Sequence, residues 1–295
     1  MNLVLLKRLA VVAILALTVV LFIRYFVANP QYIKELQHTS PWVLVQLLLV
    51  NFAMLAVITV LNQVIAEIAG KTIPKKENFL LSIYSTLANF FGPLQSGPGV
   101  RAAYLKTKHG VSLRAYSIAT FMYYACFAVG ATLLLLIGTR PWWQTLLAVV
   151  AAGGFSFFVI RAVSNRGAKK TGKPTAIVYS KRLWLLLACL TLVQLLFLTV
   201  RYYIELRSVG AQVSLGQALS YTGSASLALF VSITPDGIGI REAFLMAAQR
   251  IHGVSTANIV SANLIDRAFY LVYLGLIFLI ALATHAGDRF KVRNK

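Results

Sequence analysis

The stretch "GPGVRAAYL" at residues 97–105 has a counterpart 140 residues later, "GIGIREAFL" at residues 237–245. Each holds two glycines, an arginine at the fifth position and a leucine at the ninth. After an offset of three residues, each is followed by the same four residues, "HGVS", at 109–112 and at 252–255. So many matches in one order indicate an internal duplication, and each copy carries an arginine inside an apolar segment.

The composition is that of an integral membrane protein. The chain has 295 residues, of which 59% are hydrophobic and 12% are charged, whereas a soluble domain is about 25% charged. The formal charge of +20 lies mostly in loops between apolar runs, as the positive-inside rule requires, so we expect no nucleic-acid partner. The two cysteines, Cys126 and Cys189, lie in apolar runs and predict no disulfide framework. We expect no metal and no cofactor.

Eight apolar stretches define the expected fold. Two of them, 78–106 and 216–251, are interrupted at "GPLQSGPG" and "TPDGIG". Pro and Gly stop helices, so each is predicted to be two half-helices joined by a turn, as in a re-entrant hairpin. The sequence predicts an all-α integral membrane protein of one domain, 1–295, with repeats over 42–161 and 183–284. The six stretches long enough to span, at about 20 residues each, are 9–27, 42–66, 113–138, 141–161, 183–203 and 256–284.

The distribution of lysine and arginine predicts the topology. With the N-terminus inside and both hairpins returning to their own side, 19 of these residues are cytoplasmic and six are outside. We therefore expect both termini in the cytoplasm. The first hairpin then enters from the cytoplasm and the second from the outside, which gives inverted repeats of the kind found in transporters. The six expected outside are Arg24, Lys34, Arg140, Arg201, Arg207 and Arg250.

The two turns combine features that attract anions. Gly97 and Gly99 are expected to adopt backbone angles closed to other residues, with a half-helix starting just after them. The free N–H groups and dipole at the start of that helix favour an anion. Arg101 adds a planar guanidinium that suits phosphate; capping of the preceding half-helix is the alternative role for it. The second turn offers the matching residues Gly237, Gly239 and Arg241.

Four further residues near the turns are candidates for function. Asp266 and Arg267 lie about 16–18 Å along the last span, near the middle of the bilayer, where a charged pair suggests a functional site. A static ion-pair brace explains the same two residues equally well. Asn89 and Asp236 flank the turns and are able to contact a substrate or to satisfy unwound backbone.

Glu242 gives the second turn a carboxylate that the first turn lacks. Across the second hairpin, Glu242 is able to reach Arg267, and Asp266 is able to reach Arg241. An anion arriving at either arginine would compete with the carboxylate, which would then take up a proton. This raises the hypothesis that transport is coupled to protons.

Three stretches resemble a known family. "NFFGPLQSGPGVRAAYLK" (89–106), "TPDGIGIRE" (234–242) and "LIDRAFYLV" (264–272) look like the membrane region of lysylphosphatidylglycerol synthases, a family that includes stand-alone flippase-like proteins. The resemblance implies a domain that moves phospholipids or polyprenyl-linked lipids between the leaflets of a prokaryotic cytoplasmic (inner) membrane. The positions that carry it are Asn89, Pro93, Gly97, Gly99, Arg101, Pro235, Gly237, Gly239, Arg241, Glu242, Asp266 and Arg267.

The expected function is that of a lipid flippase without enzymatic activity. The arginines of the two turns would bind the anionic phosphate of a lipid, and the neighbouring acids would release it. Because the chain ends at Lys295 with no aminoacyltransferase domain, we expect no synthesis of lysyl lipid. A membrane-embedded enzyme acting on a lipid phosphate, and a non-transporting scaffold or lipid sensor, are the alternatives. The candidate substrate-binding residues are Arg101, Arg241, Arg267, Glu242, Asp266, Asn89, Asp236, Gly97, Gly99, Gly237 and Gly239.

Overall fold

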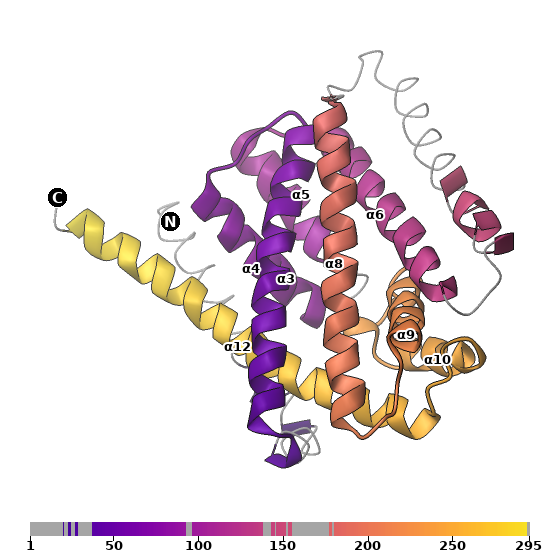
Figure 1. The fold of residues 1–295 in the computed structure, drawn as a ribbon. Helices are drawn as coiled ribbons and strands as arrows, with labels where there is room; N and C mark the ends of the chain where they lie inside the picture. The colour runs from indigo at the N-terminus through magenta and orange to yellow at the C-terminus, as the bar shows by residue number, and fades with distance from the viewer. Residues whose placement is uncertain are drawn as a thin grey trace.

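In a computed structural model, the described residues are 37–92, 96–137 and 180–293, with scattered positions within 20–28, 143–154 and 177–178. Every regular element in these ranges is a helix (Figure 1). The expected span 9–27 lies mostly outside the described residues, and about half of the expected span 141–161 does. Four helices among those described are long and apolar enough to cross a membrane, namely α3 (Pro41–Ile68), α6 (Leu113–Leu136), α8 (Lys181–Ser208) and the first 30 residues of α12 (Thr256–Arg293).

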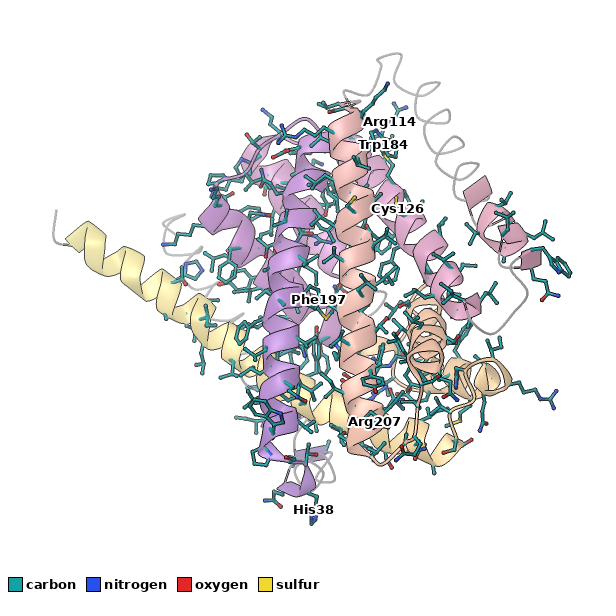
Figure 2. The ribbon with its side chains drawn as sticks, in the orientation of Figure 1. His38, Arg114, Cys126, Trp184, Phe197 and Arg207 are labelled. Carbon is teal, nitrogen blue, oxygen red and sulfur yellow. The ribbon has the colours of Figure 1, made fainter. Side chains whose placement is uncertain are left out.

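The outer faces of the long helices are apolar. α3 and α8 pack side by side at the front of Figure 1. Leu49 on α3 and Leu196 on α8 are both exposed large hydrophobic side chains, as expected of surfaces that face hydrocarbon. Charged side chains mark the helix ends instead. Figure 2 shows Arg114 at the start of α6 and Arg207 near the opposite end of the molecule, at the end of α8.

Both interrupted segments consist of short helices, two in the first and a series of short elements in the second. In the first, α4 (Lys75–Phe91) packs against α5 (Gly97–His109). At 17 and 13 residues, each is shorter than the roughly 20 residues that a span needs. The first hairpin lies in the upper part of Figure 1 and the second in the lower part. The second consists of α9 (Leu215–Ala228), the 3₁₀ turn η1 (Pro235–Gly237), α10 (Ile240–Ala247) and α11 (Gln249–His252).

Small residues let the second hairpin pack tightly against α6. α9 has the sequence "LGQALSYTGSASLA", and α6 and α9 form one of the most extensive helix contacts of the described residues. A Cβ atom added at Gly223 would lie 2.5 Å from the carbonyl oxygen of Ala131 and 2.3 Å from the backbone nitrogen of Leu135. Close approach of two backbones through small side chains is the common way for helices to associate in membranes.

The duplicated "HGVS" folds in the same way twice. The glycine of each copy ends a helix in the left-handed conformation, with φ of 65° at Gly110 and 71° at Gly253, as C-terminal caps require. The serine of each copy then begins the next long helix: Ser112 and Ser255 accept hydrogen bonds from backbone N–H groups three residues later, at 3.5 and 3.3 Å. The internal duplication is therefore also a structural one at these turns.

The expectation for the first pair of glycines is wrong. α5 begins at Gly97 itself, and neither Gly97 nor Gly99 has a positive φ. Gly97 is required because the helices approach closely there: a Cβ would lie 2.5 Å from the carbonyl oxygen of Ser85 on α4. In the second turn the expectation is confirmed, since Gly237 and Gly239 have φ of 67° and 81° and α10 begins directly after them.

Candidate functional site

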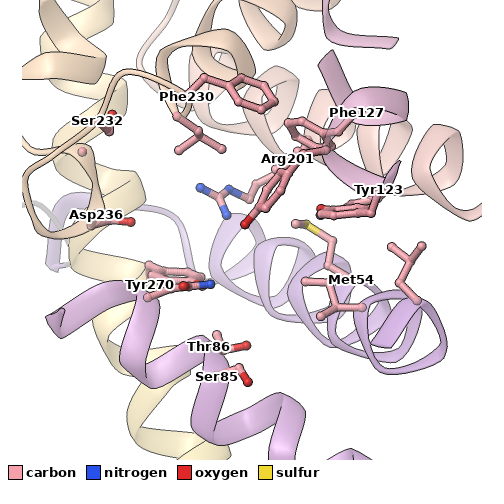
Figure 3. A pocket seen from close by; sticks show the side chains of 18 of the residues that line it. Met54, Ser85, Thr86, Tyr123, Phe127, Arg201, Phe230, Ser232, Asp236 and Tyr270 are labelled. Atoms are coloured by element: carbon pink, nitrogen blue, oxygen red, sulfur yellow. The ribbon is translucent and has the colours of Figure 1, made fainter. Parts of the chain in front are cut away.

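A cavity of about 210 Å³ lies between the two hairpins and the long helices (Figure 3). Arg101 of α5 and Arg241 of α10, the two arginines that the duplication equates, both line it. A third arginine, Arg201 of α8, also lines it, and Figure 3 shows its guanidinium group among the side chains of the wall. The cavity thus collects positive charge from both repeats.

Arg101 has no acidic partner among the residues that the structure describes. Its side chain is 8% exposed, and its Nη1 donates a hydrogen bond to the side-chain oxygen of Asn62 on α3. Its Nε has no hydrogen-bond partner, and none of the ion pairs found in the described part of the chain includes it. The next residue is Ala102, where the second repeat has Glu242. A buried charge balanced only by a neutral amide is an unfavourable arrangement unless an anion joins it.

Arg241, in contrast, is held in a chain of ion pairs. Its Nη2 lies 2.7 Å from Oδ2 of Asp266 on α12. The other carboxylate oxygen of Asp266 accepts a hydrogen bond from Arg201, and Nε of Arg201 lies 3.1 Å from Oε1 of Glu205. All four side chains are buried. Two carboxylates therefore balance two guanidinium groups on this side of the cavity.

Glu242 caps the N-terminus of its own helix, α10. Its Oε2 accepts a hydrogen bond from the backbone N–H of Gly239 at 2.8 Å, and its Oε1 accepts one from Arg267. The predictions that Glu242 reaches Arg267 and that Asp266 reaches Arg241 are confirmed. The anion that the helix N-terminus attracts is thus supplied by the chain itself.

The residues that flank the turns have different roles. The side-chain oxygen of Asn89 accepts a hydrogen bond from the backbone N–H of Gly97 at 2.7 Å, so it satisfies the unwound backbone while also lining the cavity. Asp236 adopts a left-handed conformation, with φ of 50° and ψ of 17°, and its side chain lies on the cavity wall in Figure 3. Pro93 lies outside the described residues.

About half of the predicted site residues line the cavity. Those that do are Asn89, Arg101, Asp236, Gly237, Arg241 and Asp266, and those that do not are Gly97, Gly99, Gly239, Glu242 and Arg267.

Three residues of the cavity wall with amide or guanidinium side chains were not predicted from the sequence. Arg201 was expected outside the membrane, but it is buried in α8 and joins the ion pairs. Without Arg201, five lysine and arginine residues remain in the set expected outside. Asn62, and Gln194, which accepts a hydrogen bond from Tyr123 at 3.0 Å, also line the wall. Asn62 and Gln194 are polar residues inside otherwise apolar spans, and that signal is able to identify both of them.

The open end of the first hairpin is fastened by Glu77 at the start of α4. One carboxylate oxygen lies 2.7 Å from Nζ of Lys108, and the other contacts His109, so that Glu77 joins the beginning of α4 to the end of α5. Burial opposes ionisation of this carboxyl, but hydrogen bonds from Lys108 and His109 outweigh it and lower the pKa of Glu77 to about 2. Glu77 and Lys108 therefore stay ionised throughout the physiological range of pH.

Sequence comparison identifies the family of the chain. A comparison with curated proteins finds no match. The family described as the lysylphosphatidylglycerol synthase TM region matches residues 8–278, a range that includes both turns, the cavity and all of the ion pairs around it. Together with the long apolar helices, this match makes the protein a multi-pass membrane protein. The chain belongs to the family of the lysylphosphatidylglycerol synthase TM region.

Proposed function

We propose that the protein is a flippase, which moves a lipid with an anionic phosphate between the two leaflets, and that the head group occupies the cavity between the hairpins. A phospholipid and a polyprenyl-phosphate-linked lipid share this chemistry. The observation that carries the proposal is Arg101, a buried guanidinium that lines the cavity and pairs with no carboxylate among the described residues.

The two repeats contribute unequally to the proposed site. On the second side, Asp266 already balances Arg241, so a phosphate arriving there competes with a carboxylate. On the first side, Ala102 leaves Arg101 unbalanced, and a phosphate gains a charge-assisted hydrogen bond without displacing an acid. The head group therefore binds first at Arg101, and Arg241 is recruited only when its ion pair loosens. When Arg241 exchanges Asp266 for the phosphate, both hairpins contact the same ligand.

The proposal includes the arrangement in the membrane. The hairpins are taken as re-entrant from opposite sides, with both termini in the cytoplasm. Coupling to protons through Glu242 or Asp266 stays a prediction. Because each acid is paired with an arginine, it takes up a proton only after that arginine has turned to the lipid phosphate. Glu242, whose side chain is more exposed than that of Asp266, is the acid that a proton reaches more readily.

The test compares two cations of the same helix. The purified protein is reconstituted in vesicles with fluorescent phosphatidylglycerol, and flipping is followed by quenching of the outer leaflet. Arg101→Ala is expected to lower the rate at least about tenfold, which corresponds to about 1.4 kcal/mol of lost stabilisation, and Arg101→Lys to restore only part of it because an ammonium lacks the planar fork. Lys106→Ala removes an equal charge from the exposed face of α5 and should flip normally.

Each alternative class of function has its own outcome in the same vesicles. Equal rates for Arg101→Ala and Lys106→Ala would exclude the proposed site. Chromatography of the lipid after the assay distinguishes an enzyme, which would change its chemical structure, from a transporter, which returns it unaltered. Binding of the lipid without any flipping by the unsubstituted protein would favour a scaffold or a lipid sensor.

A further inference from the structure

One side chain of the cavity wall also faces outwards. Among the residues that line the cavity in the described part of the chain, Phe230 alone is exposed, with 46% of its surface accessible, while the others are buried or half-buried. It follows directly on the last turn of α9. Phe230 is therefore a side chain that reaches both the cavity and the outer surface.

Two rings of α6 complete this wall. The ring of Phe230 meets that of Tyr124 edge to face, with centroids 5.9 Å apart, and that of Phe127 at 6.2 Å. Figure 3 shows Phe230 and Phe127 next to each other at the rim of the cavity. Beyond them the outer surface is apolar, because Val231 and Ile233 are 56% and 64% exposed. The wall separates a polar interior from a surface suited to hydrocarbon.

The size of the cavity requires such an opening. A volume of about 210 Å³ equals about seven water molecules at roughly 30 Å³ each, which suffices for a phosphate and a small head group but not for two acyl chains. The chains of a bound lipid must therefore remain in the bilayer while the head group is inside. They need a gap in the wall that is lined by apolar side chains on its outer side.

We propose that Phe230, Tyr124 and Phe127 form a lateral gate, through which the acyl chains of the lipid extend into the bilayer while its head group occupies the cavity. The inference rests on the proposed function and adds to it the path of the chains. Phe230 is the moving part, because it is the exposed member of the three and lies beyond the last regular turn of α9, held by a hydrogen bond from its N–H to the carbonyl oxygen of Leu227 at 3.1 Å. The gate closes the empty cavity to lipid tails and opens by rotation of one ring.

The first experiment varies the chains and keeps the head group. Flipping of phosphatidylglycerol is measured with straight chains and with methyl-branched chains, and the ratio of the two rates is compared between variants. Phe230→Ala widens the gate and should raise the rate for the branched lipid relative to the straight one by about threefold or more, since gating steps set many transport and turnover rates. Phe230→Trp should shift the ratio in the opposite direction. Phe121→Ala is the control, because Phe121 is a similarly exposed ring of α6 that does not line the cavity.

The second experiment closes the gate covalently. In a background in which Cys126 and Cys189 are replaced by serine, cysteines at positions 124 and 230 are joined with a short bismaleimide. Bridging should reduce flipping of either lipid to below about a tenth of the untreated rate. The two single-cysteine variants, treated with the same reagent, carry its bulk without the bridge. Each is compared with its own untreated rate, and treatment should reduce flipping in the double variant far more than in either single one.

The results separate the gate from the proposed function. If the bridged protein flips at the untreated rate, or if the ratio for Phe230→Ala equals that for Phe121→Ala, the gate is wrong, whether or not Arg101 is required. If Arg101→Ala also flips normally, the proposed function itself is wrong. Should the double-cysteine variant fail to fold, the ratios for the substitutions at position 230 decide the matter alone.

Discussion

His252 and His109 show how one duplicated residue acquires two roles. His252 is buried, its Nδ1 accepts a hydrogen bond from the backbone N–H of Val254 at 3.1 Å, and its Nε2 therefore donates to the carbonyl oxygen of Leu245 at 2.9 Å. Both nitrogens are satisfied only in the neutral ring. His109, its equivalent in the first repeat, instead contacts Glu77 near the surface. The duplicated histidine is thus a buried hydrogen-bonding residue in the second repeat and a partner of Glu77 in the first.

The buried histidine predicts a loss of stability in mild acid. Burial lowers the pKa of His252 below its ordinary value of 6.5, so the unfolded chain binds a proton that the folded chain resists. Stability is full above pH 6.5 and falls as the pH decreases from there towards 5. The His252→Gln variant should be less stable than the unsubstituted protein at pH 7.5, and its stability should change less with pH. Thermal unfolding in detergent between pH 5 and 7.5 measures both. This range lies above the pKa of Glu77 in the folded protein, about 2, and above its ordinary value of 4.5, so that Glu77 contributes little to the change in stability.

Parallel curves for the two proteins across this range would contradict the assignment, because they would mean that His252 contributes nothing to the pH dependence. A smaller slope in the variant supports it even if the variant is less stable throughout.

Single positions could be predicted from the sequence where the duplication marks them. Arg101 and Arg241 stand out because they match each other, and the pairing of Glu242 with Arg267 follows from helix geometry. Arg201 could not be found in this way. It lies near the end of an apolar run, where hydropathy alone cannot distinguish a buried charge from a loop charge, and its partner Asp266 is 65 residues away in sequence. The distinction depends on which face of α8 meets α12, which is a tertiary property.

The hairpin formed by α4 and α5 depends on one glycine and not on its neighbour. Gly97→Ala would place a Cβ 2.5 Å from a carbonyl oxygen of α4, and overpacking of this kind costs about 1–3 kcal/mol. Gly99→Ala meets nothing within 4 Å and should be neutral or stabilising by up to about 1 kcal/mol, because alanine is the better helix former. Melting temperatures of the two purified variants provide the test. A Gly99→Ala protein as unstable as Gly97→Ala would show that close packing is not the cause.

The ends of helices are predicted well from the sequence where it contains capping residues. The turn at 109–112 starts the span at residue 113, as expected, and the structure ends it at Leu136. The span expected at 183–203 extends instead over Lys181–Ser208. The expected end at residue 203 is too early because Glu205 follows it as a charged residue, yet Glu205 pairs with Arg201 one turn before it and both remain buried. When two opposite charges near the end of a span neutralise each other, the helix continues past them, and a count of charged residues places its end too early.

The ends of the molecule predict a labelling pattern. A hydrogen bond from the backbone N–H of Val178 to the carbonyl oxygen of Ile68 joins the end of α3 to the chain just before α8, while the turn at 209–214 lies at the far end of α8. With the cytoplasmic excess of lysine and arginine, a cysteine at position 71 should react only from the cytoplasm, and one at position 212 only from the outside. A membrane-impermeant maleimide applied to intact cells and to inverted vesicles measures both. The reverse pattern would overturn the expected orientation.

The architecture as a whole was predictable in outline. Pro and Gly at the two turns divided the interrupted segments into short helices, and the structure has these pairs. The cavity could not be predicted, because its wall combines residues from α3, α4, α5, α6, α8, α10, α12 and the segment 229–237. Its shape depends on how closely these helices approach, as at Gly223, and no local pattern encodes such distances.

The volume of the cavity links its occupancy to the activity of water. A space of about 210 Å³ has room for about seven water molecules, and a head group that fills it would return such waters to the bulk. Solutes too large to enter the cavity lower the activity of water outside it, and by mass action they favour whichever state retains fewer waters. Osmotic stress therefore favours the lipid-bound state, so that a cell losing water to its surroundings would hold more of this protein in complex with its lipid.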